Sequence, residues 1–145
     1  MTQSLSKTVA CAALVLSLAS VASADDQAAA ARADIAATLG AEPSFVASVA
    51  DSALPGLWAQ TKALEMSGDT ALDSKTKALI SLAVAAQIPC TYCIWSDTNT
   101  ARQNGATDQE IAEAVAVAGM TRNWSTIFNG MQVDFDTFRK ELGGQ

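Results

Sequence analysis

The pattern that most limits the possible fold is helical periodicity interrupted by glycine and proline. Apolar residues recur at intervals of three and four, and no stretch shows the period-two alternation of a half-buried strand. Gly40 and Gly105 are placed to end helices, and Pro55 suits the first turn of one. Thr107 and Glu110 stand three apart, as a capping box requires. The chain is therefore predicted to be all-α, with about six helices.

The expected helices are bounded by these helix breakers and capping residues. The helical segments so delimited number seven, close to the six or so helices expected, and cover residues 25–39, 43–53, 57–65, 74–88, 94–104, 107–118 and 120–142. Residues 77–88 (KALISLAVAAQI) have few polar positions and are predicted to form the buried central helix. Residues 124–142 are predicted to form one apolar helical stripe, which Asn129-Gly130 could kink.

The first 24 residues have the layout of a secretory signal peptide. A single lysine precedes an apolar stretch over residues 8–21, and Ala22-Ser23-Ala24 supplies a cleavage site. That stretch is shorter than the roughly 20 residues that a membrane-spanning helix needs. We therefore expect cleavage after Ala24 and a periplasmic or secreted product without stable membrane insertion. The product should be one helical domain over residues 25–145.

The composition excludes several classes of function. The formal net charge is −6 and the chain has no basic cluster, so a nucleic-acid partner is not expected. It contains no histidine, which removes His-dependent triads. Cys11 should leave with the signal peptide, and two remaining cysteines without histidine make a poor zinc site, so we expect no metal and no cofactor. An apolar fraction of 50% favours a homo-oligomer over a monomer with an alanine-rich surface.

Cys90-Thr91-Tyr92-Cys93 is the constellation with redox chemistry. Two thiols at this spacing, the first near a helix start, can close a small disulfide ring and reopen it. A static structural disulfide is the alternative, but so short a loop would gain little entropic stabilisation. The pattern therefore favours a redox function. The helix dipole alone predicts that Cys90 is the more acidic thiol.

Three residues near this pair are further candidates. Asp97 lies four residues after Cys93, hence one helical turn away on the same face. An ionised carboxylate there would repel a thiolate and raise the pKa of the thiol, whereas a partly buried, protonated one could accept the thiol proton through water. A solvated acid without a role is the alternative. Tyr92 could line the site or be a packing aromatic, and Trp95 is expected in the core or at a subunit interface.

The remaining charged residues receive plainer interpretations. Arg102 is predicted to lie at the surface or in an ion pair, and Lys75 and Lys77 to be solvated near a helix start. The acids that folding could bring near the thiols are Glu65, Asp69 and Asp73.

The stretch from residue 72 to about 117 resembles the core of the alkylhydroperoxidase D-like, or carboxymuconolactone decarboxylase, family. Its C-x-x-C lies between the apolar helix and the element A-R-x-x-G-A-T-x-x-E-I, in the family's order. The resemblance implies an all-helical domain that assembles as trimers or hexamers and reduces hydroperoxides with thiols. It implies that Cys93 is oxidised to a sulfenic acid and that Cys90 resolves it. The lactone-decarboxylating branch lacks this pair, so that activity is not expected.

The sequence departs from the redox members of that family at their proton relay. Those members carry a glutamate where this chain has Ala78 and a histidine where it has Asp97. The branch with a Trp-Ser-Thr element often has another histidine, where Asn123 stands here. Both cysteines are kept while every part of the relay is altered.

The first functional hypothesis is an exported, thiol-dependent hydroperoxide reductase with Cys93, Cys90 and Asp97 as catalytic residues. Its partners would be a hydroperoxide substrate and an unidentified thiol reductant. Lost relay residues beside retained cysteines favour a second hypothesis, a dithiol–disulfide exchange protein without peroxidase activity. The third is a non-enzymatic helical oligomer whose ancestral site has decayed.

Overall fold

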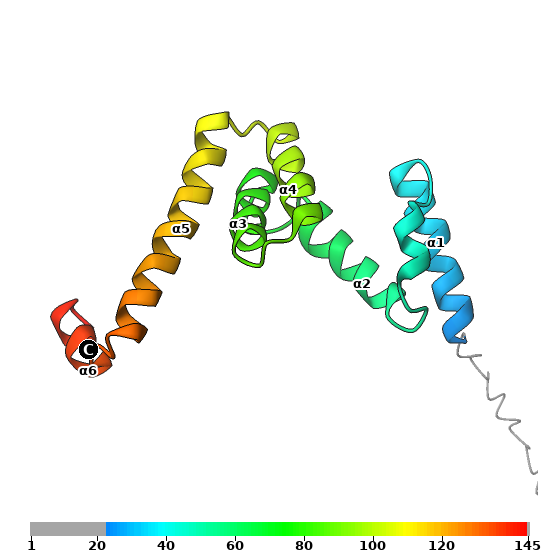
Figure 1. Ribbon diagram of the computed structural model, residues 1–145. Coiled ribbons are helices and arrows are strands. Elements are labelled where there is room, and N and C mark those ends of the chain that lie inside the picture. The colour runs from blue at the N-terminus through cyan, green and yellow to red at the C-terminus, as the bar shows by residue number, and fades with distance from the viewer. Residues whose placement is uncertain (1–22, 145) are drawn as a thin grey trace, which may run out of the picture. The chain divides into compact units, whose positions relative to one another are not determined.

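The computed structural model describes residues 23–144, and every regular element among them is helical. The elements are α1 (Ala24–Leu39), the 3₁₀ turn η1 (Ser44–Ser48), α2 (Leu54–Gln60), the π-helical segment η2 (Thr61–Met66), α3 (Ser74–Gln87), α4 (Thr91–Gln103), α5 (Asp108–Gly130) and α6 (Phe135–Glu141) (Figure 1). This confirms the all-α prediction. The described residues divide into two compact units, with the boundary between Pro55 and Gly56.

In the first unit, α1 is bounded by the signals expected for a helix. The Ser23 hydroxyl accepts the Asp26 N–H, and the Asp26 carboxylate accepts the Ser23 N–H, while Gly40 ends the helix with φ 86°. Arg32 donates to the carboxylates of two following acids, 3.0 Å from Glu42 and 2.7 Å from Asp51. The buried apolar residues of this unit are Ala28, Ala31, Ile35, Val46 and Leu54.

The prediction of a helix over residues 43–53 is wrong. The chain forms only the short 3₁₀ turn η1 there, because Val49 adopts an extended conformation and its N–H bonds the carbonyl of Val46 at 3.1 Å. Such i to i+3 bonding suits short turns and does not propagate far.

In the second unit, α3 packs against both α4 and α5, as Figure 1 shows. A cluster of small residues lies between these helices: Ala78, Ala101 and Ala106, with Leu79 and Ile111 packed against it. Leu82 and Ala85 are also buried. The predicted central position of α3 is confirmed, but Ile80 and Val84 are about half exposed, so this helix is not buried on all sides.

The single stripe expected over residues 124–142 is divided into two helices. Helix α5 runs unbroken through Gly119 to Gly130, and the chain then turns at residues 131–134, where Gln132 has φ 53°. Helix α6 folds back so that the rings of Phe128 and Phe138 lie 4.9 Å apart. The kink proposed near Asn129-Gly130 is therefore a chain reversal.

The predicted signal peptide lies almost wholly outside the described residues. Within residues 23–144 no helix is both long and apolar enough to cross a bilayer. The same residues contain no group of three or more acidic or cysteine side chains arranged to hold a metal ion.

Candidate functional site

The cysteine pair lies at the junction of α3 and α4. Helix α3 ends before Pro89, and the Cys90 N–H bonds the carbonyl of Ala85 at 3.1 Å, which holds the junction against the last turn of α3. Cys90 is the N-cap of α4, and its Cα lies 5.3 Å from that of Cys93, within the range that a disulfide spans. The two sulfurs are bonded to each other.

The N-cap position gives the two sulfurs different surroundings. The backbone N–H of Cys93 donates to the Sγ of Cys90 at 3.2 Å, so this sulfur takes the place of the usual capping oxygen. Once the bond is reduced, the same N–H and the positive end of the helix dipole would favour a thiolate at Cys90. Both cysteines are partly exposed and within reach of small reactants.

Asp97 lies one turn beyond Cys93 and is held between α4 and α3. Its carboxylate accepts a hydrogen bond from the Ser81 hydroxyl of α3. Burial raises the pKa of Asp97 above its ordinary value, and the Ser81 hydrogen bond offsets part of that rise. The result is a carboxylate more basic than a solvated aspartate, which suits a proton acceptor.

Asp97 and Ser81 line a hollow of about 320 Å³ enclosed by η2, α3 and α4, named here the η2–α3–α4 hollow. Its lining residues are Leu64, Glu65, Ser74, Lys77, Ala78, Ile80, Ser81, Val84, Ser96, Asp97 and Thr100. Ala78 and Asp97, two of the three positions at which the sequence departs from the relay implied by the resemblance, therefore line one space. Its volume falls within the range of small-ligand sites, and π-helical segments such as η2 recur at functional sites.

Lys77 fixes η2 against α3. Its Nζ donates to the carbonyls of Leu64 and Ser67 at 2.9 and 2.8 Å, and to the hydroxyl of Thr70 at 2.8 Å. All three ammonium protons are thus used, and the prediction of a solvated charge is wrong. The lysine satisfies carbonyls at the end of η2 that the helix itself leaves open.

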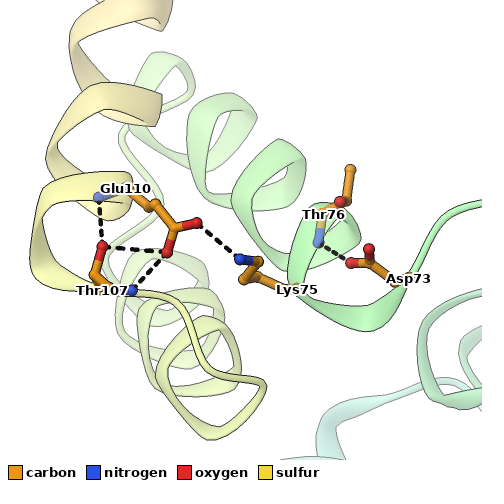
Figure 2. Close-up of polar contacts among 5 residues, drawn as sticks. All are labelled: Asp73, Lys75, Thr76, Thr107 and Glu110. Atoms are coloured by element: carbon orange, nitrogen blue, oxygen red, sulfur yellow. Dashed lines mark hydrogen bonds and ion pairs between the residues drawn. The ribbon is translucent and has the colours of Figure 1, made fainter.

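Lys75 fixes the start of α5 against α3, as Figure 2 shows. Its Nζ lies 2.7 Å from Glu110, which also completes the predicted capping box with Thr107. The ammonium of Lys75 and the hydrogen bonds from Thr107 lower the pKa of Glu110 to about 2. Lys75 is therefore an ion-pair partner and not the solvated charge expected.

Of the other three acids proposed for the site, one lines the hollow and two lie elsewhere. Glu65 lines the η2–α3–α4 hollow with Asp97. Asp73 accepts the Thr76 N–H at 2.7 Å and caps α3 (Figure 2). The cysteines follow the other end of that helix. Asp69 stands in the turn after η2, where its N–H bonds the Ser67 hydroxyl at 3.1 Å.

The aromatic residues near the cysteines are on the surface. Tyr92 is 88% exposed and Trp95 is 71% exposed, so neither is a packing residue within the described chain, and a core position for Trp95 is excluded. Arg102 forms the predicted ion pair, 2.9 Å from Asp108. Asn123 is exposed on α5.

The contact between Arg122 and Gln87, next to the site, was not predicted because no local sequence pattern indicates it. The Nε of Arg122 donates to the side chain of Gln87 at 2.8 Å, and its Nη2 donates to the Gln87 carbonyl at 3.3 Å. A guanidinium there satisfies the end of α3 and complements its dipole. It also anchors α5 directly before the cysteine loop.

The fold and the site together define an all-helical protein with a C-x-x-C disulfide at the start of one helix of a hairpin. The chain belongs to the carboxymuconolactone decarboxylase family, whose model matches residues 52–134, more than half of its length. The fold is also that of an alkylhydroperoxidase AhpD core from Rhodospirillum rubrum, a crystal structure with 30% identity and a TM-score of 0.64. The match covers 77% of this chain and 84% of that one. The family resemblance and the fold class are thereby confirmed.

A second relative is "Uncharacterized protein 4 in cox locus" of Paracoccus denitrificans. It is 46% identical over 54 residues, which cover 37% of this chain and 49% of that protein. The match thus spans about half the length of this curated relative.

Proposed function

We propose that the protein is a thiol-dependent hydroperoxide reductase in which Cys93 and Cys90 cycle between dithiol and disulfide. The observation that carries this proposal is the Cys90–Cys93 bond at the start of α4 in an AhpD-like fold. Asp97 on the same helix face and the hollow beside it supply a proton acceptor and space for a reactant. The roles of the two cysteines follow the family resemblance.

The proposed reaction has three steps. The Cys93 thiolate attacks one oxygen of ROOH, the O–O bond breaks, and the products are a sulfenic acid at Cys93 and ROH after the alkoxide gains a proton. The Cys90 thiol then displaces the sulfenic hydroxyl, forming the disulfide and releasing water. A dithiol reductant finally exchanges with the disulfide and restores both thiols while it becomes oxidised.

Asp97 is proposed to handle the proton in the first step. It takes the proton of the Cys93 thiol, directly or through one water molecule, and returns it to the leaving alkoxide. A free cysteine has a pKa of about 8.5, so at neutral pH the Cys93 thiol would be mostly protonated. It must pass its proton to such an acceptor before it can attack. A carboxylate whose pKa is raised by burial is better matched to that task than a solvated one.

Stopped-flow mixing of the reduced protein with cumene hydroperoxide tests this proposal. The wild type should consume peroxide in a single rapid phase, and Cys93→Ser should not. Cys90→Ser should still consume one equivalent but stop at the sulfenic acid, which dimedone traps. Consumption by the wild type no faster than that by Cys93→Ser would refute the reductase.

The Cys90 surroundings favour a second candidate, dithiol–disulfide exchange without peroxidase activity. The sulfur at the N-cap accepts the Cys93 N–H, which is the arrangement that lowers a thiol pKa and makes Cys90 the natural exchange nucleophile. This candidate predicts insulin reduction that Cys90→Ser abolishes, with no peroxide consumption. A pair that dithiothreitol cannot open in the folded protein would exclude it. A decayed, non-enzymatic oligomer instead predicts that replacing both cysteines leaves the phenotype intact.

Export and self-assembly belong to the same proposal. The signal-like residues 1–24 support a periplasmic or secreted product, and mass spectrometry of exported protein should find Asp25 as its first residue. The exposed apolar residues of α5, of α6 and of the position that follows each helix support a homo-oligomer. They include Val117, Met120, Trp124, Met131, Phe135 and Leu142. Light scattering after size exclusion should give the mass of a trimer or hexamer, and a monomer would contradict it.

A further inference from the structure

We infer that the η2–α3–α4 hollow selects neutral organic hydroperoxides and discriminates against those that carry a carboxylate. This inference rests on the proposed reductase function and adds the substrate class. It follows from the size of the hollow, from the charges on its wall and from the position of its lining residue Asp97 relative to Cys93.

The hollow has room for a small organic molecule with an apolar body. Its volume is about 320 Å³, and Leu64, Ile80 and Val84 contribute large apolar side chains to its wall. Polar side chains come from all three elements, and those of α3 and α4 meet where Ser81 bonds Asp97. Apolar surface combined with convergent polar groups is typical of sites that orient a small ligand.

The charges on the wall oppose an anion. Glu65 and Asp97 are the lining acids, and neither forms an ion pair with the lining lysine. Lys77 is the basic residue among the lining residues, and its three protons are used by Leu64, Ser67 and Thr70. The acceptors of Lys77 are neutral oxygens, so its positive charge remains and offsets one of the two acids. A ligand carboxylate would thus meet a wall of net negative charge whose ammonium protons are already used.

The other described lysines near this region are engaged elsewhere. Lys75 pairs with Glu110 at 2.7 Å, on the side of α3 that faces α5. The Nζ of Lys62 lies 5.8 Å from the ring centre of Trp58, a cation–π contact on α2 and η2. Neither lysine lines the hollow.

The pairing of α3 with α4 places Cys93 close to a residue that lines the hollow. The two helices run in opposite directions through a short connection, and Ser81 contacts Asp97 across them. Cys93 is one turn before Asp97, so their Cβ atoms are about 6 Å apart. Val84, one turn after Ser81, is the lining residue of α3 nearest to the cysteines along the chain. A peroxide group held beside Asp97 would lie about one helical turn from Cys93 while the organic body occupies the hollow.

A matched pair of substrates tests the inference. The probes are cumene hydroperoxide with a para-carboxylate and the methyl ester of the same compound, each corrected for its rate with a free thiol. We expect kcat/KM to be about tenfold higher for the ester at low ionic strength. The ratio should approach one in high salt, because exposed charges are then screened.

Two variants with the same charge change locate the effect. Glu65→Gln removes an acid of the hollow and should lower the ester-to-acid ratio by about threefold. Glu113→Gln removes an exposed acid of α5 outside the hollow and should leave the ratio unchanged. If the wild type reduces neither probe faster than Cys93→Ser does, the reductase proposal itself fails. Equal rates for the two probes, or a faster acid, would overturn the inference while the reductase stands.

Discussion

Truncation of the Leu82 side chain tests whether α3 is the central helix of the fold. Leu82 is 1% exposed, on the helix that packs against both α4 and α5. Leu82→Ala removes three buried carbons, which contribute about 2.4 kcal/mol at about 0.8 kcal/mol each. The cavity left behind adds about 1 kcal/mol, because the backbone relaxes only partly. The expected loss in the free energy of unfolding is therefore about 3 to 4 kcal/mol, a large part of the 5 to 15 typical of a domain.

Leu57→Ala is the matched control, because Leu57 lies in the same unit and is 53% exposed. The same three carbons then lose about half of the transfer energy and leave no closed cavity, so the expected cost is about 1 kcal/mol. Urea denaturation followed by circular dichroism gives both values, with a lower midpoint and an unchanged slope for Leu82→Ala. Equal losses for the two variants would refute the assignment of α3 as the core helix.

Three further predictions concern charge and redox state. Lys75 and the Thr107 hydrogen bonds lower the pKa of Glu110 to about 2, so the stabilisation that ionised Glu110 gives should be complete above the ordinary pKa of 4.5 and disappear as pH falls towards 2. The Tm difference between the wild type and Glu110→Gln should close over that window. Burial raises the pKa of Asp97, so Asp97→Asn should raise Tm at pH 7 and lose this advantage below about pH 4; a lower Tm at pH 7 would contradict it. The Cys90–Cys93 loop spans four residues, so reduction should cost about 2 kcal/mol in urea titrations; a loss of 4 or more would indicate a structural disulfide.

The sequence was sufficient where the determining interaction is local. Gly40 and Gly105 have positive φ at the predicted helix ends, and the Thr107 capping box forms as its spacing requires. The Cys90 position at a helix start also follows from Pro89 and the apolar run before it. In each case the partners lie within a few residues, so the pattern carries the geometry.

Contacts between distant residues could not be read in the same way. Lys75 and Glu110 are 35 residues apart, and so are Gln87 and Arg122. Lys75 and Lys77 have the same sequence surroundings near the start of α3. Which oxygens each lysine contacts depends on how η2 and α5 pack against that helix. The reversal before α6 also escaped prediction, because the periodicity of 124–142 is preserved on both sides of the turn at Gln132.

The most direct measurement of the central claim is the thiol state of the folded protein before and after peroxide. The protein is reduced with dithiothreitol, freed of reductant and treated with one equivalent of cumene hydroperoxide, and its intact mass is recorded. The account predicts that the pair opens, that one equivalent of peroxide is consumed, and that the mass falls by two hydrogen atoms as Cys90 and Cys93 rejoin. A pair that stays closed in reductant, or thiols that survive the peroxide unchanged, would contradict it.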